Sequence, residues 1–524
     1  MAYMKRNAKP RADRRPHLDI PTTTRWIVPL ALAALSIWLG VSACSRERPT
    51  PSAATPAARP AQPGAEPAQP GAEPATPTSS GELPNVGMAT VEPTPPPQVY
   101  IVQSGDTLGG IAARFGCQVD AIMRANNITD ANALQVGKQL NIPFPQIESG
   151  PSARLLPDSE FVYGPAYVDF DVAAFVAGQG GYLANYSEPV NGKVLSGAEI
   201  VSLVAHHYGV GPRLLLAMIE LKGGWVTNPS PMVAALGRHG AKSDQFSRQL
   251  AWAADRLNQG YYDWRGRGME LLTWDDGTST RYASNLNAGT AGLQFFLSLY
   301  ATKSQWATWV GDGSDSFIAT YRSLFGDPAK YAVEPLVPAG LANPSLSLPW
   351  AKGETWHFTG GPHGAWEDGC AWAALDFVPI GGPFGCALPP SPARAAAAGL
   401  VIYSQDGEVM IDLDEDGHEQ TGWVLFYLHM ASDGRVALNT HVKPGDQIGY
   451  PSCEGGFSES SHLHFARKYN GEWIAADGPL PFILSGWQAH SSGTDYDGTL
   501  TRDGQTCTAA EVWDPQVNGL TADR

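Results

Sequence analysis

The sequence predicts a multidomain chain that contains a small βααβ module, a mostly α-helical middle domain and an all-β domain built on an antiparallel sheet. Three observations support this order. The chain has 524 residues, which is too long for one domain. Two short helical patterns lie between strand-like runs in residues 99–144, and longer patterns of helical spacing fill residues 155–345. From residue 348 onward, glycine-punctuated runs alternate as strands do.

Residues 1–43 have the pattern of an export signal. A basic stretch precedes the apolar run "WIVPLALAALSIWLG", and the segment closes on "VSAC". This ending resembles the lipobox of bacterial lipoproteins, which implies that Cys44 is lipidated and becomes the mature N-terminus. An uncleaved membrane anchor is the alternative, because the apolar run is nearly long enough to span a bilayer. Both readings predict an extracytoplasmic protein attached to the membrane of a bacterial cell envelope.

Residues 44–98 are rich in proline and alanine, and the heptad "AQPGAEP" occurs twice in tandem. A segment of this composition cannot bury a core and is expected to act as a disordered, extended linker. The chain carries a formal net charge of −16. Nucleic acid is therefore excluded as a partner, since binding phosphates requires a basic face.

Residues 99–144 begin with a strand-like "VYIVQ" and a "SGDT" turn, in which Asp106 or Thr107 can cap the next helix. Two short helices are expected, followed by the closing strand of "LQVGKQLNIP". The pattern "V-x-x-GDTL…LxxGxxLxIP" resembles the LysM module over its whole length. The resemblance implies a βααβ fold that binds N-acetylglucosamine-containing glycan of peptidoglycan.

Residues 155–345 predict a helical domain, with one helix on each side of the "GVGP" turn and another helix in "NAGTAGLQFFLSLYATKSQWATWV". The piece "GVGPRLLLAMIELKGGW" is similar to the opening helices of lysozyme-like lytic transglycosylases. That family has an active-site Glu where this sequence has Lys222, and Glu220 lies two residues earlier, on another face of the helix. We therefore expect a lysozyme-like but non-catalytic domain. A glycan-cleaving enzyme centred on this region is the competing hypothesis.

Seven of the 12 histidines lie between residues 357 and 464. His462 and His464 are two residues apart in a strand-like run, so their side chains share one face of the sheet. Together with His363 and Asp376, one histidine of this pair would provide two imidazoles and a carboxylate. That is a ligand set of a catalytic zinc ion, which keeps a further position open for water.

The region from about residue 348 to 485 resembles the M23 family of zinc endopeptidases, the lysostaphin-like group, and we place the domain at residues 348–510. The resemblance implies that His363, Asp376 and His464 bind one Zn²⁺ and that His429 and His462 flank it as catalytic residues. It also implies hydrolysis of the peptide cross-links of peptidoglycan. An M23-like envelope protein that is inactive, binds peptidoglycan and regulates or scaffolds other hydrolases is the alternative.

One departure from the family pattern concerns the spacing of the first two ligands. Thirteen positions separate His363 from Asp376, more than in much of the family. The intervening "GAWEDGCAWAAL" makes the region similar to the β-lytic, staphylolytic branch. It also leaves His357 as a rival to His363.

Two smaller features complete the candidate residues. Asp412, Asp414 and Asp416 precede Gly417 as in a calcium loop, but the twelfth position is Trp423 and an acidic turn between strands is the simpler interpretation. The cysteines of the last third of the chain predict two disulfides in an oxidising compartment. From proximity alone, the expected pairs are Cys370–Cys386 and Cys453–Cys507, with the chain after residue 490 forming a loop held by the second disulfide.

Overall fold

The computed structural model describes residues 98–103, 106–115, 117, 119–131, 134–143, 148–236, 245–382 and 385–523. The expected signal segment, Cys44 and most of the linker lie outside the described residues. Among the helices of the described residues, none is both long enough and apolar enough to cross a membrane.

The first described module has the element order β–α–α–β. Strand β1 pairs with β2 in an antiparallel ladder, and Thr107 rather than Asp106 caps the first helix by accepting a hydrogen bond from Gly110 N at 3.0 Å. Ile122 and Leu140 are fully buried between helices and strands. The elements are β1 (Gln98–Ile101), α1 (Leu108–Phe115), α2 (Val119–Ala125) and β2 (Gln139–Ile142).

The middle region is mainly helical, with small strand pairs between the helices. Its helices are α3 (Asp158–Phe161), α4 (Val172–Gln179), α5 (Gly197–Tyr208), α6 (Pro212–Gly223), α7 (Phe246–Tyr262), α8 (Ala288–Ser298), α9 (Lys303–Val310) and α10 (Phe317–Phe325). Its strands are β3 (Glu148–Ser149), β4 (Ser187–Val190), β5 (Lys193–Ser196), β6 (Leu271–Thr273) and β7 (Ser279–Arg281). The expected break at "GVGP" separates α5 from α6.

Local signals explain these helices, including one that the sequence analysis did not resolve. Ser196 and Glu199 form a capping box at the start of α5, and Gly209 ends the helix with a φ of 67°. The run expected as one helix forms two, α8 and α9. The chain restarts at Thr302, whose hydroxyl accepts a hydrogen bond from Gln305 N in a second capping box.

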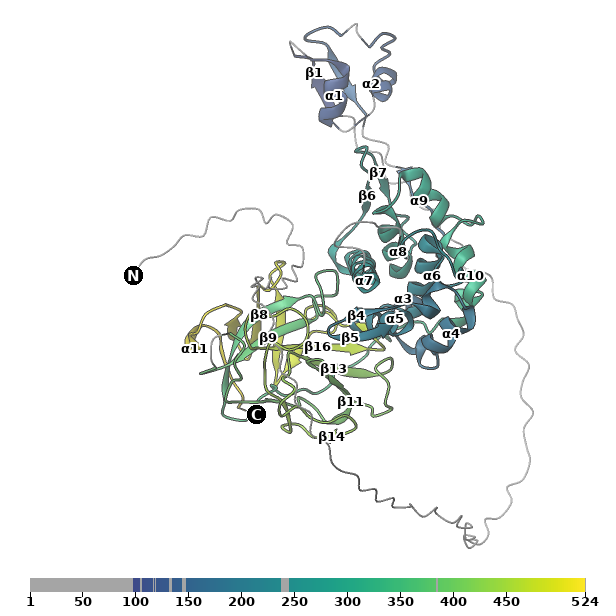
Figure 1. Cartoon of the computed structure of the whole chain (residues 1–524). Helices are drawn as coiled ribbons and strands as arrows, with labels where there is room; N and C mark the ends of the chain where they lie inside the picture. Colours follow the sequence, from purple (N-terminus) through teal and green to yellow (C-terminus); the bar gives the residue numbers. More distant parts are fainter. Residues whose placement is uncertain are drawn as a thin grey trace, which may run out of the picture. The chain divides into compact units, whose positions relative to one another are not determined.

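The C-terminal region contains a nine-stranded antiparallel sheet, whose central strands lie side by side in Figure 1. The strand order is β14-β11-β12-β13-β16-β9-β8-β22, and β17 pairs with β16 off this path. The strands are β8 (Thr355–His363), β9 (Ala374–Pro379), β11 (Gly399–Gln405), β12 (Glu408–Asp412), β13 (Trp423–Leu428), β14 (His441–Val442), β16 (Leu463–Tyr469), β17 (Glu472–Trp473) and β22 (Gly519–Thr521).

Each face of this sheet belongs to a different hydrophobic core. Along β13, Leu425 and Tyr427 pack into one core, whereas Phe426 and Leu428 pack into the core that also contains the helices of the middle region. This alternation follows from the two-residue period of a strand. The helical region therefore packs against one face of the sheet, and on β16 the residues of that face are His464, Ala466 and Lys468.

The chain after residue 490 is not the loop expected from the sequence, but belongs to a small sheet that begins at Ile483. This four-stranded antiparallel sheet consists of β18 (Ile483–Leu484), β19 (Trp487–Ser491), β20 (Gly498–Arg502) and β21 (Gln505–Thr508), followed by α11 (Pro515–Asn518). Leu484, Ala489 and Leu500 are fully buried in the core on the second face of the large sheet. Strand pairing and burial thus hold this segment in place. The two-stranded sheet of β10 (Ala393–Arg394) and β15 (Gln447–Gly449) completes the region.

The expected disulfide pairing is wrong. The structure has one disulfide among the described residues, Cys386–Cys453, with a Cα–Cα distance of 5.3 Å. Cys370 and Cys507 are free and buried in the cores on opposite faces of the sheet, so they cannot reach the partners proposed for them. Asn258 Nδ2 of α7 lies 3.3 Å from Cys370 Sγ, as a hydrogen-bond donor.

Candidate metal centre

Four adjacent strands bring the candidate site residues together. His363 is the last residue of β8, Asp376 lies on β9 and His464 on β16, while His429 directly follows β13. In the ladders, His464 is opposite Asp376 on one side and opposite Leu428 on the other. His462 precedes β16 by one residue. The pairing of the strands thus brings the predicted residues together near one end of these strands, on the face that the helices cover.

His363, Asp376 and His464 form a tight cluster of three potential ligands. The Nε2 atom of His363 lies 3.0 Å from Nδ1 of His464, and Asp376 Oδ1 lies 3.3 Å from each of these nitrogens. All three residues are buried. The chain thus concentrates two imidazole nitrogens and a carboxylate oxygen at one buried point.

Backbone carbonyls determine which nitrogen of each imidazole faces this point. His363 Nδ1 lies 2.8 Å from Gly361 O, and His464 Nε2 lies 2.8 Å from Ala365 O. A carbonyl oxygen can only accept a hydrogen bond, so each of these ring nitrogens carries the proton. In the neutral rings, the two nitrogens that face each other at 3.0 Å are therefore both lone-pair donors.

The carboxylate of Asp376 adds a second indication of a bound cation. Its Oδ1 atom is buried and accepts no hydrogen bond of acceptable geometry from the described residues, although two imidazoles lie close by. Burial by itself would raise the pKa of Asp376, but His363 and His462, when protonated, outweigh this and hold the pKa well below its usual range. A buried anion beside two lone pairs fits a divalent cation, and two nitrogens with one carboxylate are a donor set that Zn²⁺ accepts.

His429 and His462 lie next to this cluster but are anchored differently. His429 Nδ1 donates a hydrogen bond to Glu454 O at 3.0 Å, and His462 Nδ1 donates to Ser460 O at 2.8 Å. Both Nε2 atoms are thus left as acceptors, and the centroids of the two rings are 4.5 Å apart. The Nε2 atom of His462 lies 3.7 Å from Asp376 Oδ1.

His429 is held in an unusual conformation and electrostatic environment. Its φ of 64° lies in the left-handed region, which is rare for residues other than glycine and is often found at functional sites. Burial, together with the neighbouring His462 and His464, lowers the pKa of His429 to about 3. The imidazole is therefore neutral at neutral pH.

A glycine makes room for the carboxylate of Asp376. Gly360 is opposite Asp376 in the β8–β9 ladder, between two irregularities of the register. A Cβ atom at this position would lie 2.7 Å from Asp376 Oδ2. Only glycine therefore leaves this carboxylate in its present place.

The structure also assigns places to the competing candidates. His357 is buried and bonded through Nδ1 to Asn518 Oδ1 at 2.8 Å, so it belongs to the contact with α11 and not to the ligand cluster. Glu220 accepts hydrogen bonds from Val226 N and Thr227 N, at 3.0 and 3.1 Å, and so caps the turn after α6. This bonding gives Glu220 a structural role in the middle region.

The aspartates Asp412, Asp414 and Asp416 do lie close together, with one carboxylate oxygen of each within 4.8 Å of the others. Asp412 already accepts hydrogen bonds from Gly417 N and Asp414 N, at 2.9 and 3.2 Å. Burial and the adjacent Asp414 raise the pKa of Asp412 to about 6. These bonds describe an acidic turn between β12 and β13, and Ca²⁺ at this turn stays a prediction.

Tyr496 is a neighbour of the site that the sequence analysis did not identify. Its ring stacks on that of His363, with centroids 4.1 Å apart and planes inclined by 18°. Gly361 N donates a hydrogen bond to Tyr496 O at 2.8 Å, and Tyr496 has a φ of 62°. Its sequence context, "GTDYDG", carries no signal for this contact, because the segment is far along the chain from His363.

The long insertion between His363 and Asp376 connects the site to the helical region. Trp366 stacks on His207 of α5 with ring centroids 4.0 Å apart, and Gly369 N donates a hydrogen bond to Asp255 Oδ1 of α7 at 2.8 Å. The insertion therefore has a defined packing role against two helices.

Comparisons with known proteins agree with these three regions. Residues 100–143 match the LysM domain model, residues 154–338 match the model of the LasA N-terminal domain, and residues 386–476 match peptidase family M23. The M23 match includes His429, His462 and His464, whereas His363 and Asp376 precede it. The likeness of the middle region to lysozyme-like enzymes stays a prediction.

Two relatives and one solved structure illustrate the similarity. Protease LasA of Pseudomonas aeruginosa (strain UCBPP-PA14) is 28% identical over 352 residues, which cover 63% of this chain and 77% of the relative. The beta-lytic metalloendopeptidase of Achromobacter lyticus is 26% identical over 183 residues, 34% of this chain and 44% of the relative. The structure of the M23 metalloprotease pseudoalterin covers 33% of this chain and 96% of its own, at 24% identity and a TM-score of 0.27.

Proposed function

We propose that this chain, which carries LysM and peptidase family M23 domains, is a zinc metalloendopeptidase that hydrolyses the peptide cross-links of bacterial peptidoglycan. The observation that supports this most strongly is the cluster in which two imidazole lone pairs converge with a carboxylate oxygen that accepts no hydrogen bond of acceptable geometry from the described residues. His363, Asp376 and His464 would hold the metal ion. Bound there, a divalent ion such as Zn²⁺ would supply Lewis-acid polarisation of a water molecule and of the scissile carbonyl.

His429 and His462 would handle the protons of the reaction. Each has its Nδ1 proton fixed on a backbone carbonyl, which leaves Nε2 to accept a proton from the attacking water and to return it to the leaving amine. Protonated in this way, either ring could also donate a hydrogen bond to the developing oxyanion. The low pKa of His429 keeps its imidazole neutral at neutral pH, so that Nε2 carries a lone pair.

The rest of the chain would hold the metal centre close to peptidoglycan. The LysM module would bind glycan and raise the local concentration of cross-links at the peptidase domain. A lipid on Cys44 would anchor the protein to the membrane, and the proline- and alanine-rich segment after it would let the folded part reach the wall above. On this proposal, the protein acts outside the cytoplasm.

The test is to incubate the purified full chain with purified peptidoglycan, with and without a chelator, and to identify the released fragments by mass spectrometry. The proposal predicts new amino termini that disappear with chelator and return when Zn²⁺ is added. His441→Ala is a matched control, because the side chain of His441 is 68% exposed and lies outside the cluster. This variant should cleave as the unaltered chain does.

Two results would contradict the proposal. Binding of the chain to peptidoglycan without release of fragments would favour the inactive, regulatory alternative. New sugar ends without new amino termini would instead indicate glycan cleavage by the middle region.

A further inference from the structure

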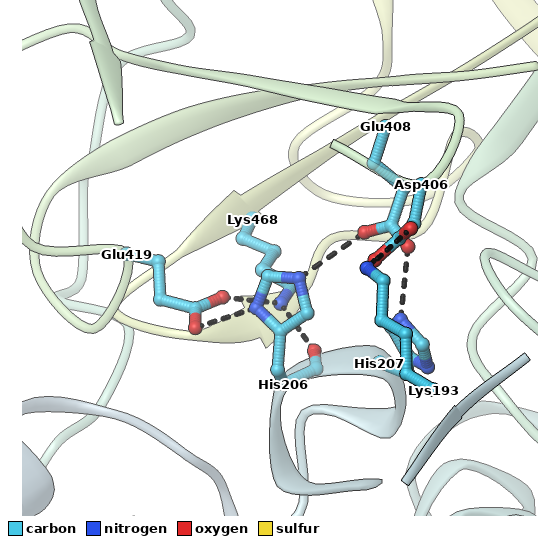
Figure 2. A network of polar contacts seen from close by, with 7 residues as sticks. All are labelled: Lys193, His206, His207, Asp406, Glu408, Glu419 and Lys468. Carbon is cyan, nitrogen blue, oxygen red and sulfur yellow. Dashed lines mark hydrogen bonds and ion pairs between the residues drawn. The ribbon is translucent and has the colours of Figure 1, made fainter. Parts of the chain in front are cut away.

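A second cluster of histidines and carboxylates lies where the helical region meets the sheet. His206 and His207 occupy the last turn of α5, and Glu408 begins β12 on the sheet side. The Nε2 atom of His206 lies 3.1 Å from Glu408 Oε2, and that of His207 lies 2.9 Å from Glu408 Oε1. Figure 2 shows both rings approaching this carboxylate, with further polar side chains around them. These neighbours are Glu419, Lys468, Lys193 and Asp406.

Each of the two imidazoles is held in place by packing against an aromatic side chain. The ring of His207 stacks on Trp366, and the ring of His206 packs on Tyr403 with centroids 4.4 Å apart. His206 Nδ1 lies 2.7 Å from Glu419 Oε1. A carboxylate at the far nitrogen is the arrangement that orients a metal-binding histidine and raises its basicity. The two side chains are thus preorganised, with both Nε2 atoms directed at Glu408.

The cluster requires positive charge beyond what its lysine supplies. Lys468 Nζ lies 3.1 Å from Glu419 Oε2 and also donates a hydrogen bond to His206 O, at the negative end of α5. With both imidazoles neutral, the carboxylates of Glu408 and Glu419 outnumber this one ammonium group. Lys193 and Asp406 pair with each other and leave that balance unchanged.

A proton on His206 is one source of the missing charge. Burial by itself would lower the pKa of His206, but the adjacent Glu419 and Glu408 raise it to about 9. The second imidazole, His207, lies 2.9 Å from Glu408 Oε1 through its Nε2 atom and would pair with this carboxylate when protonated. The Nε2 atom of His207 is buried and makes no hydrogen bond of acceptable geometry with the described residues, despite its closeness to Glu408.

A divalent cation accounts for both rings. One potential ligand atom from each of His206, His207 and Glu408 lies within 4.8 Å of the others. Two imidazole nitrogens and a carboxylate are a donor set suited to zinc and similar borderline ions. We propose that His206, His207 and Glu408 form a second divalent-metal site, separate from the His363 cluster, that ties the end of α5 to β12.

Such a site would strengthen the interface between the helical region and the sheet. Because the ligands come from the helical region and from the sheet, binding of the ion would add a coordinate link to an interface otherwise held by apolar packing and ion pairs. The imidazoles must be neutral to bind, so uptake of the ion displaces the proton from His206. Removal of the ion should therefore weaken this interface and leave each region folded.

The test counts the zinc ions bound by the full chain. The chain is stripped with a chelator, reloaded with Zn²⁺, dialysed and analysed by native mass spectrometry and elemental analysis. The proposal predicts two equivalents for the unaltered chain and one for either His207→Ala or Asp376→Ala, with the bound ion lost from a different site in each variant. The double variant should bind none, and His441→Ala should retain two.

One equivalent in the unaltered chain, unchanged by His207→Ala, would overturn the proposal and identify the cluster as ion pairs only. That measurement on the unaltered chain stands even if a variant fails to fold. Failure of the proposed peptidase activity is distinguishable, because the second equivalent is counted without reference to cleavage. A further readout is limited proteolysis, in which chelation should speed cutting between the two regions in the unaltered chain but not in His207→Ala.

Discussion

His363 Nε2 and His464 Nδ1 face each other at 3.0 Å, and the opposite nitrogen of each ring donates its hydrogen to a backbone carbonyl. Two lone pairs at this distance repel unless a cation or a proton lies between them. The neighbouring Asp376 Oδ1, buried and without a hydrogen bond of acceptable geometry among the described residues, provides the negative charge that retains such a cation. The chemistry proposed for the chain depends on this arrangement.

Replacement of His429 or His462 by alanine should abolish most activity without removing the metal. Neither ring belongs to the ligand cluster, and loss of a positioned general acid–base group slows reactions by about 100- to 10,000-fold. Cleavage rate and bound zinc are measured on the same samples. A variant that loses both its activity and its zinc would place the altered histidine among the ligands instead.

Gly360→Ala should weaken metal binding at the first site. The added methyl group would displace the carboxylate of Asp376, and a misplaced metal environment lowers affinity by about 10- to 100-fold. Zinc affinity is measured by competition with a chromophoric chelator. Gly313→Ala is the control, because a Cβ there meets no atom within 4 Å. Equal affinities for the two variants would contradict the role given to Gly360.

Peptide mapping of the unreduced protein should recover a cross-linked pair that contains Cys386 and Cys453. Replacing both by serine should lower the free energy of unfolding by about 2 to 4 kcal/mol, because the disulfide closes a long loop in the unfolded chain. Urea unfolding measures the loss. Recovery of a peptide pair linking Cys370 to Cys386 would contradict the structure.

The ion pairs at the interface between the helical region and the sheet should make the stability of the metal-free protein sensitive to acid. His206 and Lys468 lower the pKa of Glu419 from 4.5 to about 2, against the effect of burial. The stabilisation is therefore complete above pH 4.5 and is lost as the pH falls through 2, amounting to about 3 kcal/mol. Glu419→Gln should cost most at pH 6 and progressively less towards pH 2. Glu270→Gln, at a residue whose side chain is 72% exposed, should show no such trend.

The structure brings together the residues that the sequence singled out for the first site, because strand geometry is local. The two-residue spacing of His462 and His464 places them on one face, and the structure puts His363 and Asp376 beside that face. Strand β13 ends immediately before His429. The order of a βααβ module, a helical region and an antiparallel sheet was predictable for the same reason.

Contacts between distant segments were not predictable. The pairing of Cys386 with Cys453 depends on which cysteines fall in a core and which in a loop, and proximity along the chain gave the wrong answer. A tight turn at Asp406 and Gly407, with φ values of 51° and 82°, joins β11 to β12. That turn brings Glu408 to His206 and His207, a cluster that no motif announces.

The most direct test of the central claim compares the unaltered chain with Asp376→Asn on the same peptidoglycan, each first stripped of metal and then reloaded with Zn²⁺. Asparagine preserves the shape of the side chain but removes the charge that retains the cation. We expect the unaltered chain to release new amino termini only after reloading and the variant to release almost none in either state. Release by Asp376→Asn at the rate of the unaltered chain would show that the cluster of His363, Asp376 and His464 is not the catalytic centre.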